Sequence, residues 1–160
     1  MIVALLSFVA VNGQVAQAGQ QVEEKSEVRT AGPLPPHATG YAHVEIDLSR
    51  QRLSVVDGFG SVVKTLPVSS GSGKWFTSEG RTRRAITPRG RFTVSRKIAG
   101  WHKSPLGMLY YTSYINQGVA IHGSRSVPRR PSSHGCIRIP MAAAKEFFEA
   151  TPIGTVVVVH

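Results

Sequence analysis

Residues 132–138 read Ser-Ser-His-Gly-Cys-Ile-Arg and contain the only cysteine of the 160-residue chain, Cys136. The cysteine lies two residues after a histidine and two residues before an arginine. A free thiol is largely un-ionised at neutral pH, so a nucleophilic cysteine needs a base nearby. An unpaired cysteine otherwise serves as a small buried apolar side chain or as half of an intermolecular disulfide.

Two histidines are candidates for that base. His134 lies inside the stretch, and His122 lies twelve residues earlier, directly after the apolar run 119–121. If residues 134–136 are extended, the His134 and Cys136 side chains share one face, with their Cα atoms roughly 6 to 7 Å apart. His122 ends a predicted strand, which is a rigid place to hold a base. Spacing alone leaves both histidines open.

A glycine follows each histidine, at Gly123 and Gly135. Glycine lets the backbone bend sharply and expose its amides. The N–H groups of Gly135 and Cys136 are therefore candidate donors to an oxyanion formed when the thiolate attacks a carbonyl.

These motifs resemble the L,D-transpeptidase catalytic domain family of the YkuD type. The resemblance rests on Ile-His-Gly-Ser at 121–124, an eleven-residue interval between the histidines, and Ser-His-Gly-Cys-Ile-Arg at 133–138. Val-Ser-Ser-Gly at 68–71 and Thr-Pro-Arg-Gly-Arg-Phe at 87–92 are similar to the SxG and TPxGxF elements of that family, and the run 154–158 matches its last strand. The resemblance covers about residues 41–160.

The resemblance implies a mainly β, sandwich-like fold with one late helix and a buried C-terminal strand. It also implies a cysteine peptidyltransferase that acts on bacterial peptidoglycan. The family's nucleophile maps to Cys136 and its general base to His122. The other motif positions would bind substrate or shape the site: His134, Gly135, Arg138, Gly123 and Ser133. Positions 70–71 and 87–90 are expected to form turns that serve the fold.

In the implied reaction, Cys136 attacks a tetrapeptide stem, expels D-alanine and forms a thioester. An amine of a second stem, a lipoprotein or a free D-amino acid then takes the acyl group. Water in that role would make the enzyme an L,D-carboxypeptidase or a peptidoglycan hydrolase, and the residues leave this choice open. Acylation by carbapenem-type inhibitors is also implied. We expect a monomer without cofactor or metal.

Two other hypotheses, a zinc site and a non-catalytic binding module, compete with the enzyme interpretation. Cys136, His134 and His122, with His102 as a further ligand, could bind zinc, although a short spacing such as CxxC is absent. A non-catalytic module that binds an anionic wall through its positive surface would need no thiol. Arginines in the loop between the histidines either attract an anionic substrate or simply face solvent: Arg125, Arg129 and Arg130.

The composition fits one globular domain, with 41% hydrophobic and 18% charged residues. Lys and Arg outnumber Asp and Glu by 19 to 9, which gives a formal net charge of +10. This excess predicts a polyanionic partner, such as nucleic acid in the cytoplasm, or a carboxylate-rich wall or anionic lipid outside it. Because the chain is predicted to be exported, a partner outside the cytoplasm is favoured, and we expect no nucleic-acid partner.

The first forty residues predict export. An apolar run at 2–11, too short to span a bilayer, is followed by Ala16-Gln17-Ala18, which is typical of a signal peptide over 1–18. Residues 19–40 are polar and then rich in proline and glycine, which predicts a flexible linker. The catalytic domain then spans 41–160, in the periplasm or cell wall, with a Gram-negative periplasm preferred.

Local patterns predict mostly strands. Asp57-Gly58 is a hairpin signal between two of them. A late helix begins at Pro140 and ends at Thr151-Pro152, with Phe147 and Phe148 in the core. The unbroken apolar run 155–159 predicts a strand buried on both faces. The other predicted strands are 43–48, 52–56, 62–68, 91–95, 109–113 and 118–121, and residues 69–90 are predicted to be loop.

Overall fold

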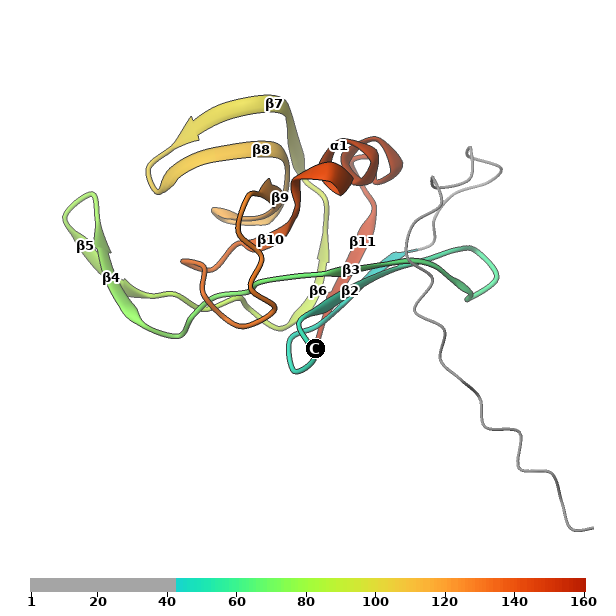
Figure 1. Ribbon diagram of the computed structural model, residues 1–160, viewed down its shortest axis with the longest axis horizontal. Helices are drawn as coiled ribbons and strands as arrows, with labels where there is room; N and C mark the ends of the chain where they lie inside the picture. Colours follow the sequence, from blue (N-terminus) through green and yellow to red (C-terminus); the bar gives the residue numbers. More distant parts are fainter. Residues whose placement is uncertain (1–42) are drawn as a thin grey trace, which may run out of the picture.

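The computed structural model describes residues 43–160, which form strands β1 to β11 and one helix, α1 (Figure 1). The predicted signal peptide, the predicted linker and the predicted domain start at residue 41 lie outside the described residues. Within 43–160 the single helix has ten residues, and no helix there is both long and apolar enough to cross a membrane.

The first sheet is mixed and has the strand order β3-β2-β1-β11-β6. The C-terminal strand β11 lies between β1, with which it is parallel, and β6, with which it is antiparallel. The last strand of the chain therefore pairs with the first and closes the domain. The strands are β1 (His43–Asp47), β2 (Arg52–Val56), β3 (Val62–Pro67), β6 (Gly90–Thr93) and β11 (Val156–Val159).

The second sheet has the order β10-β9-β8-β7 and carries the cysteine motif. Its pairs are antiparallel except β9 and β10, which run parallel. Helix α1 (Met141–Ala150) follows β10 and packs on β7 to β10, with Ala144 and Phe147 buried. The strands are β7 (Arg96–Ser104), β8 (Gly107–Asn116), β9 (Val119–Ser124) and β10 (Ile137–Pro140).

One hydrophobic core joins the two sheets and the helix. It includes Val44 and Ile46 of β1, Ile121 of β9, and Ile137 and Ile139 of β10, all fully buried. Isoleucine and valine alternate with more exposed residues along β1 and β10, so each sheet turns one face inward. The predicted mainly β, sandwich-like fold with one late helix is confirmed.

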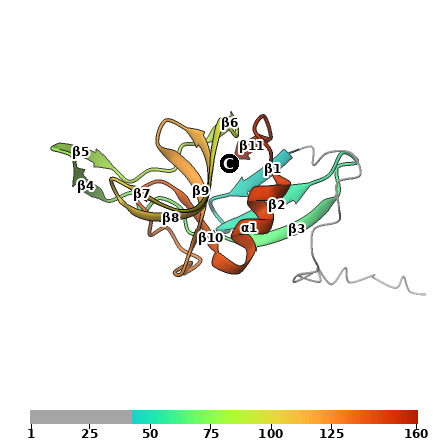
Figure 2. The ribbon, with the colours of Figure 1, turned by 90° about the horizontal axis from the view of Figure 1, so that it is seen from above.

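A separate two-stranded ribbon lies within residues 69–90, where the sequence predicted only loop. Strands β4 (Trp75–Ser78) and β5 (Arg81–Arg84) pair around the turn Glu79-Gly80. Both turn residues have positive φ, 51° and 70°, as a type I′ turn requires. Both views show the ribbon at the end of the molecule where the β7–β8 hairpin also projects (Figures 1 and 2). The Gly, Ser and Arg content of residues 69–90 led to the prediction of loop in place of these two strands.

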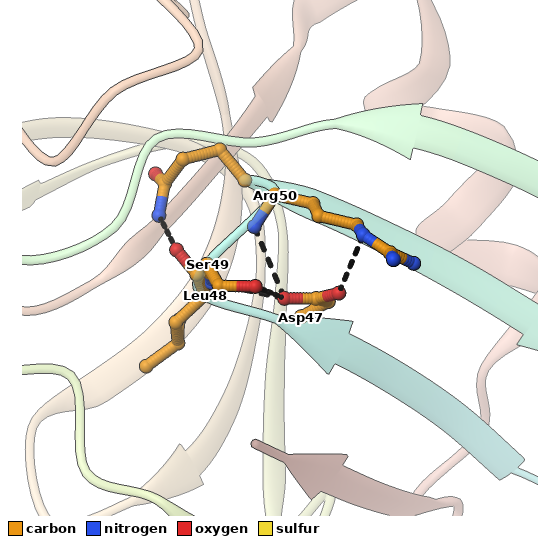
Figure 3. A network of polar contacts seen from close by, with 5 residues as sticks. Asp47, Leu48, Ser49 and Arg50 are labelled. Atoms are coloured by element: carbon orange, nitrogen blue, oxygen red, sulfur yellow. Dashed lines mark hydrogen bonds and ion pairs between the residues drawn. The ribbon is translucent and has the colours of Figure 1, made fainter.

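The turn between β1 and β2 is fixed by one carboxylate (Figure 3). Asp47 Oδ1 accepts hydrogen bonds from the backbone N–H groups of Ser49 and Arg50 and from the Ser49 hydroxyl. The Ser49 hydroxyl, followed by the Arg50 N–H, lowers the pKa of this carboxyl. The turn presents the buried Gln51, whose amide nitrogen donates to the Leu48 carbonyl at 2.6 Å. Gln51 then reaches toward the cysteine motif.

The other local predictions have mixed outcomes. The strand 52–56 and the hairpin around Asp57-Gly58 are confirmed. Strand 109–113 is longer than predicted, because it pairs with the unpredicted β7 over most of its length. Pro140 is the helix N-cap rather than its first residue, and Phe148 is only half-buried. Val157 and Val159 of the last strand are buried but its other two residues are not, so burial on both faces was wrong.

Candidate active site

Strands β9 and β10 bring the motif residues together. In this parallel pair Ile121 lies beside Ile137, and His122 lies beside Arg138. The two isoleucines point into the core, so the alternation of a strand turns His122 and Arg138 to the opposite face. His122 lies inside β9, which ends at Ser124, and not at the end of a strand as predicted.

Cys136 directly precedes β10, two residues before Arg138 on the same strand path. Its thiol is half-buried, and Sγ donates to the Gly118 carbonyl at 3.6 Å, in the turn between β8 and β9. Cys136, His122, Arg138 and Gly118 all line one cleft with a volume of about 610 Å³. The fold therefore gathers the predicted nucleophile, the predicted base and the motif arginine at one opening.

Ser133 closes the turn that carries the cysteine. Its buried hydroxyl donates to the Cys136 carbonyl at 2.5 Å and accepts from the Gly135 N–H at 3.0 Å. The Gly135 N–H is thus engaged within the turn, which favours the Cys136 N–H as the oxyanion donor of the two predicted. Residues 134–136 form a bend rather than an extended segment, because these two bonds fold the chain back on itself.

Gly135 also meets a steric demand. Its φ is +129°, a region that L side chains rarely adopt. A Cβ at this position would lie 3.0 Å from the Ile86 carbonyl oxygen. The position therefore shapes the site through its backbone.

Gly123 shapes the site in a different way. It lies inside the regular strand β9, and a Cβ there would lie 2.6 Å from the Ala144 Cβ of helix α1 and 3.0 Å from the Tyr110 ring. Its carbonyl oxygen also contacts the His122 ring. Gly123 therefore sets the approach of the helix to the strand that holds His122.

The segment between β3 and β4, residues 68–74, supports the loop that carries the cysteine. Ser70 accepts backbone bonds from the Ser132 and Ser133 N–H groups at 2.8 and 2.9 Å. The Ser70 hydroxyl and N–H are in turn bound by the Gln51 side-chain amide, both at 2.8 Å. The turn of Figure 3 is therefore connected through Gln51 to the cysteine motif.

Thr87 makes a second support. Its hydroxyl donates to the Gly135 carbonyl at 2.7 Å and accepts from the Gly71 N–H at 2.8 Å. These bonds agree with the predicted service to the fold, but the predicted turns are wrong: Gly71 forms an isolated β-bridge with Ser133, and Gly90 begins β6. Thr87 supports the residue directly before Cys136, a long-range contact that no local pattern reveals.

The His122 ring is held in a defined tautomer. Its Nδ1 lies 2.9 Å from the Gly123 carbonyl oxygen, which can only accept, so Nδ1 carries the proton and Nε2 is left as the basic nitrogen. Burial lowers the pKa of His122, and the positive charges of Arg138 and of protonated His102 lower it further, against the Gly123 carbonyl, which raises it. The neutral, basic form is therefore favoured.

The Cys136 thiol is shifted in the opposite direction. Burial raises its pKa, while a hydrogen bond with the Ala120 backbone and the charge of Arg138 lower it. Burial is the largest of these effects. A raised pKa for the thiol and a lowered pKa for the imidazole together favour the neutral forms of both groups.

His134 lines the same cleft as this pair, but its ring is engaged elsewhere. Its exposed ring contacts Phe76 of β4, with ring centroids 4.8 Å apart and planes tilted by 57°. His134 lines both the cleft and a neighbouring groove of about 480 Å³. Its position suits shaping of the cleft wall. Within 43–160 the structure shows no group of three or more His, Cys, Asp or Glu side chains that could hold a metal ion.

Sequence reasoning missed several residues of the cleft wall. Gly118 contacts the thiol, and the ribbon β4–β5 and the β7–β8 hairpin line the opening. Tyr114 of β8 also lines it, and the Tyr114 hydroxyl lies 3.2 Å from His102 Nε2. The glycine of the Glu79-Gly80 turn was the signal that could have revealed the ribbon.

Comparisons with known proteins agree with this geometry. The family model of the L,D-transpeptidase catalytic domain, YkuD, matches residues 41–159. The chain combines a sandwich of two sheets with a cysteine and a histidine at one cleft. Because the family model matches most of its length, the chain belongs to the L,D-transpeptidase catalytic-domain family. No curated protein matches the chain at a significant level.

Similar solved structures are L,D-transpeptidases. The one from Xylanimonas cellulosilytica is 41% identical with a TM-score of 0.72, and the match covers 78% of this chain and 63% of that one. A cysteine-to-serine variant from Enterococcus faecium is 26% identical with a TM-score of 0.60, covering 74% and 49%. A third L,D-transpeptidase, solved in complex with imipenem, is 22% identical with a TM-score of 0.58, covering 75% and 59%, and shows the fold alone. The chain thus spans less than two thirds of each of these structures.

Proposed function

We propose that this chain is a cysteine-dependent peptidoglycan L,D-transpeptidase that transfers a tetrapeptide stem to an amine. The observation that carries the proposal is the convergence of Cys136, His122 and Arg138 on one cleft, with Nε2 of His122 left as the basic nitrogen. Family membership supplies the reaction class.

The first step makes an acyl-enzyme. Nε2 of His122 takes the thiol proton as Cys136 Sγ attacks the carbonyl that links the L-centre of the third stem residue to the terminal D-alanine. The Cys136 N–H, rather than the Gly135 N–H, donates to the resulting oxyanion. The carbon–nitrogen bond then breaks, His122 returns the proton to the leaving amine, and D-alanine departs from a thioester.

The second step transfers the acyl group. An amine attacks the thioester carbonyl, and His122 takes a proton from that amine. The carbon–sulfur bond then breaks, and His122 passes the proton to the departing sulfur, which regenerates the thiol and the neutral imidazole. The product is a new amide bond. The amine of a second stem would give a cross-link, and a lipoprotein or a D-amino acid could act in the same place.

Arg138 is proposed to bind a carboxylate of the donor stem. The half-buried guanidinium shares the cleft with Cys136, and its Nη1 lies 3.5 Å from the Ser132 hydroxyl, so its other N–H groups can bind a carboxylate in a bidentate manner. Carbapenem-type inhibitors are proposed to acylate the same thiol. One of the similar L,D-transpeptidases was solved with imipenem bound.

We also propose that the chain is exported to the periplasm or cell wall, because residues 1–40 have the pattern of a signal peptide and linker and because peptidoglycan lies there. We propose that it acts as a monomer. The net charge of +10 suits an anionic wall.

The proposal is tested by incubating the purified chain with tetrapeptide muropeptides and following the products by mass spectrometry. Cross-linked dimers that have lost D-alanine are expected, and they should vanish with Cys136→Ala. Clipped tripeptides without dimers would instead assign an L,D-carboxypeptidase. If the native chain forms neither product yet binds peptidoglycan in a salt-sensitive way that Cys136→Ala preserves, the chain is a non-catalytic wall-binding module.

A second measurement identifies the nucleophile without a muropeptide. A carbapenem should add one covalent adduct to the intact mass of the native chain. Cys136→Ala should show none.

A further inference from the structure

The β4–β5 ribbon turns one of its faces toward the cleft. Phe76 and Arg83 lie directly opposite each other in the antiparallel pair, so their side chains share a face. The Phe76 ring contacts His134 of the cysteine motif, and both Phe76 and Arg83 line the cleft. That shared face therefore forms a wall of the opening that contains Cys136.

The neighbouring pair has the other orientation. Trp75 and Arg84 lie opposite each other and, by alternation, face away from the cleft. The Arg84 guanidinium carbon lies 5.9 Å from the centre of the Trp75 ring, and its Nε donates to the Gly73 carbonyl at 3.1 Å. Arg83 and Arg84 are thus adjacent in sequence, equal in charge and opposite in direction.

The cleft wall is strongly cationic. Four arginines line it, against one acidic residue, Glu79 at the ribbon tip: Arg83, Arg96, Arg125 and Arg138. A set of fixed positive charges around one opening attracts anionic groups and raises their local concentration.

Three of these arginines already have partners. The Arg96 guanidinium lies 3.9 Å from the centre of the Tyr114 ring, and that of Arg125 lies 5.9 Å from the centre of the Trp101 ring. Arg138 contacts the Ser132 hydroxyl. Among residues 43–160, no ion pair, hydrogen bond or ring contact engages the guanidinium of Arg83. Its five N–H donors are all available to a ligand.

We propose that Arg83 is a specificity residue that binds a second carboxylate of the donor stem, so that stems with a free carboxylate are preferred over their amidated forms. This inference rests on the proposed transpeptidase function. Arg138 lies on the strand path of Cys136 and is placed for a carboxylate close to the scissile bond. Arg83 approaches from the ribbon and binds a carboxylate farther along the stem.

The chemistry of the ligand follows from the guanidinium. A planar guanidinium binds a carboxylate through two parallel N–H···O bonds, whereas a primary amide offers a single neutral acceptor and two donors that oppose the arginine. Converting one stem carboxylate into an amide changes charge with almost no change of shape. The preference is therefore electrostatic and should weaken as salt rises.

The experiment compares two synthetic tetrapeptide donors that differ only in whether a side carboxyl is the free acid or the primary amide. D-alanine release is measured for the native chain, Arg83→Gln and Arg84→Gln. The native chain should favour the acid donor by roughly tenfold in kcat/KM at low salt. Arg83→Gln should lose this preference by slowing the acid donor alone, and Arg84→Gln should keep it.

Binding of both donors to Cys136→Ala, and to Cys136→Ala combined with Arg83→Gln, is measured by calorimetry, so that recognition is assessed without turnover. A preference for the acid donor that disappears with Arg83→Gln supports the inference. Equal handling of the two donors by the native chain overturns it, and so does an equal loss for both donors in Arg83→Gln. If the chain forms no acyl-enzyme from the stem, D-alanine release is absent for every donor and variant, and if water is the acceptor, release occurs without cross-linked dimers; both patterns differ from those that overturn the role of Arg83.

Discussion

Replacing Thr87 with valine should damage the cysteine site without touching substrate. The Thr87 hydroxyl is buried and bonds two backbone groups, the Gly135 carbonyl at 2.7 Å and the Gly71 N–H at 2.8 Å. Valine keeps the shape of threonine but removes both bonds. Because Gly135 directly precedes Cys136, the loss acts on the backbone that positions the thiol.

The expected cost follows from the burial of the two orphaned groups. A buried polar group that loses its partner costs about 1–3 kcal/mol. The Gly135 carbonyl is buried and the Gly71 amide only partly so, and we therefore expect a total of about 2–4 kcal/mol. For a domain of this size, that loss lowers the melting temperature by roughly 8–16 °C.

Urea unfolding followed by tryptophan fluorescence measures the stability, and the rate of D-alanine release measures the site. We expect Thr87→Val to slow release by about tenfold or more, because a small displacement of reacting groups is costly. Thr87→Ser keeps the hydroxyl and should stay close to the native chain in both assays. A Thr87→Val variant as stable and active as the native chain would refute the reasoning, as would a serine variant no better than valine.

Further predictions concern titration and packing. Burial raises the pKa of Cys136 above its ordinary 9.0, so in His122→Ala alkylation by iodoacetamide should still accelerate above pH 9, and a plateau at lower pH would contradict this. Burial lowers the pKa of His122 below 6.5, so the acid limb of D-alanine release should lie below pH 6.5. The His122 ring therefore binds a proton less readily in the folded state than in the unfolded state. The stability that the neutral ring contributes is complete above pH 6.5 and is lost as the pH falls through the folded-state pKa. Urea unfolding midpoints measured across this pH range would show the loss. Gly123→Ala places a Cβ 2.6 Å from the Ala144 Cβ and should destabilise the domain by about 1–3 kcal/mol, whereas an unchanged urea midpoint would show that α1 moves freely.

The cleft also explains why one arginine is singled out among so many. The chain carries a large excess of basic residues, and composition alone cannot separate a solvated arginine from one that meets substrate. The ribbon does so by alternation, since Arg83 faces the cysteine motif and Arg84 does not. Neither residue could be assigned while residues 69–90 were regarded as loop.

Local patterns in the sequence predicted much of the fold. Alternating apolar residues marked β1 and β2, Asp57-Gly58 marked the hairpin, and the spacing of Ala144 and Phe147 marked the helix face. These patterns depend on neighbours a few residues apart, so the chain carries them without tertiary information. The 133–138 motif also fixed the family, and with it the candidate nucleophile.

The choice between the histidines shows where local information ended. Spacing placed His134 nearest to Cys136, and only family resemblance favoured His122. The structure places His122 beside Arg138 through the parallel pairing of β9 and β10, and packs the exposed His134 ring against Phe76 of the ribbon. Strand register is a long-range property, and a shift of one residue would have turned His122 into the core.

The sequence by itself determined which chemical groups the protein possesses: one thiol, its flanking histidines, a late helix and a run of strands. Only the tertiary structure decided which of these groups meet, which pKa values burial shifts, and that Thr87 and Gln51 support a loop some fifty and eighty residues away. The physical reason is that burial, strand register and the pairing of buried polar groups depend on contacts between distant segments, which no local pattern encodes.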